Sequence, residues 1–495
     1  RTIYLEAALN YKNTFGRHDV SGMLLFNQSD EINTKATNVE EALPYRFRGL
    51  AGRFTYGFDD RYFAEFNFGY NGSENFTPKN RYGFFPSVGL GWVISNESFF
   101  EPLTNVIQYL KVRGTWGQVG NSQISGRRFA YLATVTDSSS TSYTFGKNMD
   151  QNYGTTAIDE YAVDVTWEVA DKTDIGVDMR LLNNKLNLQF DYFKESREGI
   201  YLRRSSIPSY VGMINNPYGN IGKVENKGFE LSVNYANSWG GDWSLSLMGN
   251  YSFNRNKVLE DDSTVVYPWQ NTIGNKVGQR FGLVALGLFE SYGEIAASPV
   301  QTGDTRPGDI KYKDINGDGK IDEYDKVPIG WGSVPEIMYG FGFSVGWKNL
   351  SLTAMFQGAA HVDAMLSGEG VLPFSQGSSR GNLLSNITDR WTEENPRQNA
   401  FYPRLSIGNI NMNYEESTWW LKDTDYLRLK NIELSYRLPD HWMKRIHLDN
   451  ARIFIQGVNL LTFSSFKIWD VELGDGRGAR YPNIASVSLG VNFNF

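Results

Sequence analysis

The sequence predicts an all-β protein that crosses a membrane as an antiparallel β-barrel, and three observations lead to this fold class. Residues 487–495 alternate apolar and polar side chains without interruption and end on Phe495. Aromatic residues make up 15% of the 495 residues, and the chain contains 50 glycines. Tight turns alternate with long connections. Strands with one apolar face, aromatic girdles and this alternation of connections are typical of outer-membrane barrels.

Fifteen segments carry the strand pattern. In residues 337–347, for example, every odd-numbered residue is apolar, whereas the residues between them are glycine, serine or methionine. A tilted strand needs about ten residues to cross the hydrocarbon of a bilayer, and many of the segments reach that length. The predicted strands are residues 1–11, 17–28, 45–57, 61–73, 82–95, 106–118, 170–182, 185–202, 224–237, 242–255, 335–347, 350–361, 425–438, 451–463 and 484–495.

The connections between these strands differ in length in a regular way. Tight turns are predicted at residues 58–61, 183–184, 238–241 and 348–349, and we place them on the periplasmic side. The long connections are rich in Gly, Asn, Asp and Ser and show no clear periodicity, so we expect them to be external loops without regular structure. These loops are residues 119–165, 203–223, 256–334, 362–422 and 464–483.

The strand count predicts that the chain does not close a barrel alone. If the last strand runs toward the periplasm, the first of fifteen antiparallel strands does so too. Single-chain bacterial barrels normally have an even number of strands. We therefore expect an odd number of further strands, either before Arg1 or on another chain, so that residues 1–495 are the C-terminal arc of the barrel.

Composition and motifs exclude several classes of protein. The mean hydropathy is −0.41 and no run approaches eighteen apolar residues, which excludes a transmembrane helix. The net charge of −7 offers no basic stripe for nucleic acid, and the absence of cysteine excludes disulfides and thiolate metal sites. Neither an HExxH nor a GxSxG motif is present, and paired acids such as Asp261 and Asp262 are interpreted as solvated loop charge. We predict that the protein is not an enzyme and holds no organic cofactor.

Residues 314–325 form the sharpest local motif, DINGDGKIDEYD. Oxygen-bearing side chains stand at loop positions 1, 3, 5, 9 and 12, glycine at position 6 and an apolar residue at position 8, which is the spacing of a calcium-binding loop. An Asx-rich turn without metal is the alternative interpretation. We expect a calcium ion that stiffens the loop at 256–334 and does no chemistry. The predicted ligands are Asp314, Asn316, Asp318, the carbonyl of Lys320, Asp322 and Asp325.

Three residue pairs in the loops have two interpretations each. Arg127–Arg128 and Arg203–Arg204 are candidates for an acidic ligand or for lipopolysaccharide phosphates, and the simpler interpretation is solvated loop charge. Trp419–Trp420 precede a strand, where tryptophan either stacks on a sugar ring or belongs to the interfacial aromatic belt. In each case the simpler alternative, loop charge or belt, is the one that we expect.

Six segments, in order along nearly the whole chain, resemble the barrel portion of the SusC-like TonB-dependent outer-membrane transporters of Bacteroidota. Each segment alone is weak evidence, but together they are specific. They are FPSVGLGW at 85–92, LKVRGTWGQVGN at 110–121, NKGFEL at 226–231, GDIKYKDINGDG at 308–319, YLRLKNIEL at 426–434 and QGVNLL at 456–461.

The resemblance implies a 22-stranded, plugged barrel in the outer membrane, a strand number also typical of such transporters. It implies active import of oligosaccharides or peptides, a SusD-like surface lipoprotein as a lid, and energy supplied by the TonB complex. A dimer of the transporter–lipoprotein pair is an arrangement that it allows. The plug, the TonB box and the early strands of the family are not in this sequence, so the expected contact with TonB lies in a region absent from it.

Three functional classes follow from the sequence. The first is an active, TonB-dependent importer embedded in outer-membrane lipid. The second is a passive porin, which fits the strand alternation equally well but has neither plug nor lid. The third is a soluble all-β binding protein, which would extract into buffer without detergent. The sequence does not distinguish glycan from peptide as the substrate.

Overall fold

The computed structural model describes residues 1–36, 42–123, 128–149, 151–374, 383–445 and 448–494. The chain divides into two compact units. The first comprises residues 1–229, 255–264 and 272–277, and the second comprises residues 230–254, 265–271 and 278–495. No helix among the described residues is both long and apolar enough to span a membrane.

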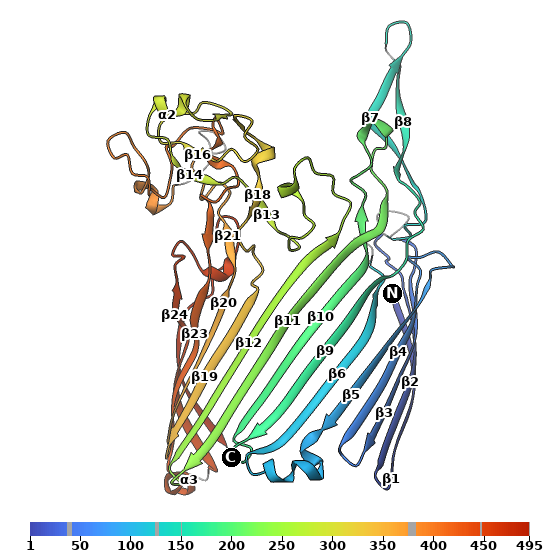
Figure 1. The fold of residues 1–495 in the computed structure, drawn as a ribbon, viewed down its shortest axis with the longest axis vertical. Coiled ribbons are helices and arrows are strands. Elements are labelled where there is room, and N and C mark those ends of the chain that lie inside the picture. Colours follow the sequence, from blue (N-terminus) through green and yellow to red (C-terminus); the bar gives the residue numbers. More distant parts are fainter. Residues whose placement is uncertain (37–41, 124–127, 150, 375–382, 446–447, 495) are drawn as a thin grey trace. The chain divides into compact units, whose positions relative to one another are not determined.

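Fifteen long strands form one sheet, in which sequence neighbours are also neighbours in space. Figure 1 shows the strands of each unit running side by side. Every predicted strand is therefore confirmed, with ends that shift by a few residues. In sheet order the strands are β1 (Thr2–Phe15), β2 (His18–Glu31), β3 (Tyr45–Phe58), β4 (Tyr62–Ser73), β5 (Tyr82–Val93), β6 (Ile107–Asn121), β9 (Glu168–Leu181), β10 (Leu186–Arg203), β11 (Tyr218–Trp239), β12 (Trp243–Glu260), β19 (Ile337–Trp347), β20 (Leu350–Ala360), β23 (Tyr426–Arg437), β24 (Asn450–Ser464) and β25 (Ser486–Asn494).

The strand pairs are antiparallel, and the register places apolar side chains on one face and polar side chains on the other. In the first unit, Ile175 of β9 faces Gly114 of β6 on the apolar face, and Ile175 is 53% exposed. On the opposite face Arg113 forms ion pairs with Asp174 at 2.9 Å and with Asp178 at 3.4 Å. This alternation is the one expected of a barrel wall with a lipid-facing and a lumenal side.

The long connections are not structureless, which corrects the expectation from the sequence. Those of the second unit contain a packed apolar cluster whose largest fully buried members include Trp420, Tyr312 and Tyr402. Short elements frame this cluster. They are η4 (Pro268–Gln270), β13 (Arg280–Gly282), β14 (Ala285–Leu288), α2 (Tyr292–Ala296), β15 (Val300–Gln301), β16 (Ile310–Tyr312), β17 (Lys320–Ile321), η5 (Glu323–Asp325), β18 (Val327–Ile329), β21 (Asp363–Met365), η6 (Ser385–Thr388), η7 (Met412–Tyr414), β22 (Leu421–Asp423) and η8 (Val471–Leu473).

The first unit also carries structure in its predicted loops. A hairpin of β7 (Thr134–Phe145) and β8 (Gln151–Glu160) was not predicted, and Figure 1 shows it extending beyond the ends of β6 and β9. In the same unit, Phe85 packs against Trp167, with ring centroids 5.2 Å apart. A Cβ on Gly120 would lie 1.9 Å from the Phe85 ring, so this glycine is needed for the packing. The remaining short elements are η1 (Ile94–Asn96), η2 (Ser98–Leu103), η3 (Ser209–Val211) and α3 (Asp440–Arg445).

Candidate functional site

The folded connections of the second unit form the candidate site, which we call the head. It consists of residues 265–271, 278–334 and 464–483 together with the described residues of 362–422. Its apolar cluster draws on three connections that are far apart in the sequence, with Ile310, Tyr402 and Val471 as examples. The head is therefore one packed body rather than three independent loops.

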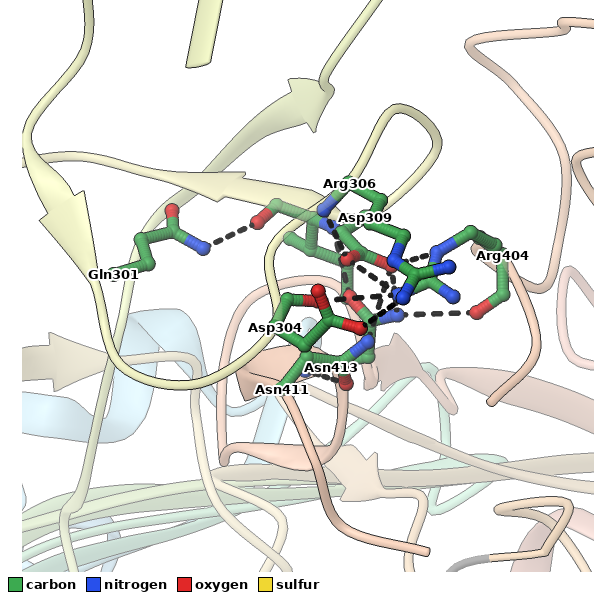
Figure 2. A network of polar contacts seen from close by, with 8 residues as sticks. Gln301, Asp304, Arg306, Asp309, Arg404, Asn411 and Asn413 are labelled. Atoms are coloured by element: carbon green, nitrogen blue, oxygen red, sulfur yellow. Dashed lines mark hydrogen bonds and ion pairs between the residues drawn. The ribbon is translucent and has the colours of Figure 1, made fainter. Parts of the chain in front are cut away.

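A buried carboxylate fastens two of these connections to each other. Asp309 is 1% exposed, and Arg404 donates to it twice, from Nε to Oδ1 and from Nη2 to Oδ2, both at 2.9 Å. Asn411 Nδ2 and Asn413 Nδ2 donate to Oδ1 at 3.1 and 2.8 Å, and the backbone N–H of Arg306 donates to Oδ2 at 2.8 Å. Figure 2 shows these donors converging on Asp309. A charge buried this deeply is stable only with such partners.

Side-chain amides then hold the backbone of β16. Asn413 Oδ1 accepts the N–H of Ile310 at 2.9 Å, and Gln301 Oε1 accepts the N–H of Tyr312 at the same distance. Gln301 Nε2 donates to the carbonyl of Ile310 at 2.9 Å. These bonds satisfy buried backbone groups that a strand of three residues leaves unpaired.

Buried tyrosines add neutral hydrogen-bonding groups to the head. Burial raises the pKa of Tyr414 to about 12, and the Tyr414 hydroxyl donates to the carbonyl of Pro373. Burial also raises the pKa of Tyr312, whose hydroxyl donates to the carbonyl of Met412 at 2.8 Å. Both side chains therefore remain neutral donors over the physiological pH range.

A hollow of about 310 Å³ lies within the head between the predicted calcium loop and the segment that carries the asparagines. Leu283 and Ile321 supply apolar surface, whereas Asp322, Glu323 and Glu415 supply carboxylates. Lys326 reaches two of these acids, Glu323 at 2.6 Å and Glu415 at 3.8 Å. The hollow has the volume of a small ligand pocket.

The predicted calcium loop is folded as a series of side-chain-to-backbone turns. Asp314 accepts the N–H groups of Gly317 at 2.6 Å and Gly319 at 2.9 Å, one with each carboxylate oxygen. Asn316 Oδ1 accepts the N–H of Asp318 at 3.0 Å, and Asp318 Oδ1 accepts that of Lys320 at 2.9 Å. In calcium loops such turns wrap the chain around the cation, but Asx-rich sequences also form these turns without a metal ion.

The last predicted ligand differs from the others because it is fully buried. Asp325 is 0% exposed, and its carboxylate accepts N–H groups from Ile315 at 2.8 Å and Asp322 at 2.9 Å. None of the ion pairs found within the described ranges involves Asp325. The same ranges contain no group of three or more His, Cys, Asp or Glu side chains already gathered for a metal ion.

Aromatic side chains hold the end of this loop. Trp269 Nε1 donates to the carbonyl of Tyr324 at 2.8 Å, and Gln270 Nε2 donates to that of Glu323 at 3.1 Å. Tyr267 stacks on Trp269 with ring centroids 4.6 Å apart and packs edge-on against Tyr324. The loop thus rests on a rigid support inside the head.

Two arginines attach the connection at 464–483. Arg428, which is 2% exposed, forms ion pairs with Asp470 at 2.8 Å and Glu472 at 2.9 Å. Arg280 pairs with Asp475 at 2.6 Å. Asp475 Oδ1 also accepts the N–H of Met365 at 2.9 Å, so the third connection is bound to both of the others.

Several interpretations of the loop residues were wrong. Trp420 is 1% exposed and belongs to the head's core, so it neither lies in an interfacial belt nor presents a sugar platform. Trp419 is partly buried and packs against the same core, so it does not lie in the belt either. Arg128 is not solvated loop charge, because it is 7% exposed and its guanidinium lies 3.4 Å from the Tyr45 ring centroid. Its neighbour at position 127 lies outside the described residues.

The second arginine pair also has partners. Arg203 pairs with Glu160 at 2.7 Å and lies over the ring of Tyr218, and Arg204 lies 3.9 Å from Asp262. The paired acids Asp261 and Asp262 accept hydrogen bonds from loop residues and form no opposed catalytic pair. Sequence reasoning missed Asp309, Arg404 and the two asparagines as a cluster, although Asp309 stands in the motif at 308–319.

Comparison with known proteins gives a consistent result. The family described as TonB dependent receptor-like, beta-barrel matches residues 2–460. TonB-dependent receptor P3 of Formosa agariphila is 28% identical over 90% of this chain and 45% of its own length. TonB-dependent receptor SusC of Bacteroides thetaiotaomicron is 27% identical over 90% of this chain and 43% of its own length. The chain thus spans about half the length of these relatives.

Solved structures support the same fold. The structure of the RagAB peptide transporter matches 100% of this chain and 55% of its own chain, with a TM-score of 0.74 and 21% sequence identity. The RagAB peptide importer in its open-open state matches with a TM-score of 0.75 at 21% identity.

Proposed function

Because the chain belongs to the TonB-dependent receptor-like β-barrel family, we propose that it serves TonB-dependent import of oligosaccharides or peptides. The protein lies in the bacterial outer membrane, and its sequence is SusC-like. The observation that carries the proposal is the family match over residues 2–460, which contains thirteen of the fifteen long strands completely and most of β24. The relatives are named as receptors of this type and not as enzymes.

The head supports the import proposal structurally. Importers need an external surface that holds its shape while substrate and partner proteins bind, and loops without packing cannot supply one. Here a buried apolar cluster, the Asp309 network and two arginine clamps fix three long connections. We propose that a SusD-like lipoprotein rests on this surface and that the lipoprotein and the head together select the substrate.

The experiment for import uses the source bacterium with and without the gene. Cells receive a mixture of oligosaccharides and peptides, and mass spectrometry follows the depletion of each pool from the medium. The deletion strain is expected to leave one pool undepleted, and a plasmid copy restores its uptake. RagAB is a peptide transporter, so peptides are the first pool to fractionate. Equal depletion of both pools by both strains would contradict the proposal.

The experiment for the partner is affinity purification of the tagged full-length protein from outer membranes in mild detergent. A surface lipoprotein of the SusD type is expected in equal amount. A D309N variant, in which the Asp309 network is broken, is expected to lose the lipoprotein while the barrel stays in the membrane. Recovery of the transporter alone from wild-type membranes would refute the partnership.

We also propose that residues 314–325 bind a structural calcium ion. The ligands would be Asp314, Asn316, Asp318, Asp322, Asp325 and the carbonyl of Lys320. Support comes from the spacing, from the side-chain-to-backbone turns and from the buried Asp325, which has no cationic partner among the described residues. Calcium content is measured by mass spectrometry after gel filtration. D325N is expected to lose the ion, whereas E323Q in the same loop, whose side chain is 77% exposed, keeps it. Equal calcium in D325N and wild type would refute the site.

A further inference from the structure

The apolar face of the first unit carries a groove that the transport function does not use. Tyr56 of β3, Ala64 of β4, Leu90 of β5, Gly114 of β6 and Ile175 of β9 are consecutive partners in one row across the sheet. Large side chains in this row alternate with the two small ones. Leu90 is 64% exposed and Ile175 is 53% exposed, so the positions of Ala64 and Gly114 are notches beside protruding side chains.

The groove along this row has a volume of about 620 Å³. Its walls include Tyr62, Trp92 and Val112. A Cβ added to Gly114 would meet only the carbonyl oxygen of Asp174, at 3.9 Å, so the notch is open. Arg113 also lines the groove, but its guanidinium pairs with Asp174 on the opposite face of the sheet. Since the protein lies in the outer membrane, hydrocarbon is what covers this apolar face.

Polar atoms at one end of the groove mark the membrane interface. Tyr62 Oη and Trp92 Nε1 both donate to Glu97 Oε1, at 2.6 and 3.1 Å, and their rings are stacked with centroids 6.4 Å apart. Tyrosine and tryptophan anchored in this way are typical of the boundary between lipid tails and head groups. The tight turn at residues 58–61 immediately precedes Tyr62, and short turns of outer-membrane barrels lie on the periplasmic side, so we assign this boundary to the periplasm.

The charges at that boundary favour a cationic group on the ligand. Arg17 and Arg61 pair with Asp59, and Arg61 also pairs with Glu97. Together with Asp60, this group contains three carboxylates and two arginines and therefore carries one net negative charge. Asp60 is exposed and takes part in none of the ion pairs found in the described part of the chain. An ammonium group beside Asp60 would balance that charge, whereas a phosphate without an amine would add to it.

We propose that this groove binds one acyl chain of an amine-headed phospholipid from the periplasm-facing leaflet, with the ammonium group of the lipid beside Asp60. The notches at Ala64 and Gly114 accept the chain, and Tyr62 and Trp92 flank the point where it meets the head group. The acyl chain fills the space that the small residues Ala64 and Gly114 leave between the large side chains of the row.

Native mass spectrometry of the full-length protein in detergent tests the groove. The protein is titrated with phosphatidylethanolamine or with phosphatidylglycerol of the same acyl chains. Wild type is expected to bind one phosphatidylethanolamine at least tenfold more tightly than phosphatidylglycerol. G114F and A64F fill the notches and are expected to lose this binding. G249F is the matched control, because Gly249 lies on the apolar face of β12 and its Cβ would likewise meet only a backbone oxygen, at 3.9 Å.

The outcomes separate the parts of the proposal. Retained binding in both G114F and A64F would overturn the groove, and so would an equal loss in G114F and G249F, since that loss would be a general effect of added bulk. D60N is expected to bind the two lipids equally. An unchanged preference in D60N, or a preference of wild type for phosphatidylglycerol, would overturn the assignment of the amine head group.

Discussion

Replacing Asp309 by asparagine tests whether the head is held by its buried carboxylate. The substitution keeps the shape of the side chain but removes the charge that faces Arg404, and it turns one acceptor oxygen into a donor among five converging donors. Removing one partner of a buried ion pair costs about 3–5 kcal/mol. We expect the free energy of opening of the head to fall by about 3 kcal/mol, the lower end of this range, because the Arg404 side chain is 18% exposed and water can reach it.

Hydrogen–deuterium exchange measures this cost locally. The amides of Ile310 and Tyr312 bond to Asn413 and Gln301 and so report on the opening of the head. A loss of about 3 kcal/mol is expected to speed their exchange about 100-fold. Peptides from β1 to β6 serve as the internal reference and are expected to stay unchanged.

D304N is the matched control. Asp304 lies in the same connection and pairs with Arg306 at 2.6 Å, but its side chain is 45% exposed. Exchange in D304N is expected to stay within about threefold of wild type, because exposed ion pairs contribute little. The reasoning is refuted if D309N behaves like D304N, since the buried network would then not hold the head.

Three further perturbations follow from the same structure. G308A is expected to speed hydrogen exchange of residues 389–402 about tenfold or more, because its Cβ would lie 2.2 Å from the Trp391 ring at a φ of +86°. G317A, at a φ of +77° with open space around it, is expected to show only the smaller effect of backbone strain, and equal effects of the two variants would contradict the packing argument. The raised pKa of Tyr414 contributes stability that is complete below pH 10 and is lost as the pH rises toward 12, by up to about 2 kcal/mol. Y414F is expected to flatten this alkaline decline when the melting temperature is measured over a series of pH values, and an unchanged decline would contradict the role of Tyr414. R428M removes the arginine partner of Asp470 and Glu472 and is expected to lower the free energy of opening of residues 464–483, measured by hydrogen–deuterium exchange, by about 3–5 kcal/mol, while R480M, at an exposed position of the same connection, does not. Protection that survives in R428M would show that the clamp is dispensable.

The strands could be predicted from the sequence because their physical requirement is local. Each strand must show lipid an apolar side chain at every second position, so segments such as 337–347 carry a complete period of two. The hairpin of β7 and β8 escaped prediction because residues 137–142 are a run of Asp, Ser and Thr that carries no apolar alternation. Hairpins outside the membrane have no need of a lipid-facing row.

The head could not be predicted because its order is not local. Its strands are short, and β15 and β17 have two residues each, which is too few to show any period. The network of Asp309 depends on Arg404, Asn411 and Asn413, which are about a hundred residues away in the sequence. Only the motif at 308–319 indicated that this region is special, and of its residues the sequence assigned roles only to the predicted calcium ligands.

Dependence of uptake on energy tests the central claim most directly. Cells that express the protein take up the substrate pool identified by gene deletion, and the uptake rate is compared before and after the proton gradient of the inner membrane is dissipated, with a strain that lacks TonB as a second comparison. Uptake is expected to fall to the level of the gene-deletion strain in both cases. Uptake that continues at the original rate without the gradient and without TonB would contradict the account and identify a passive channel.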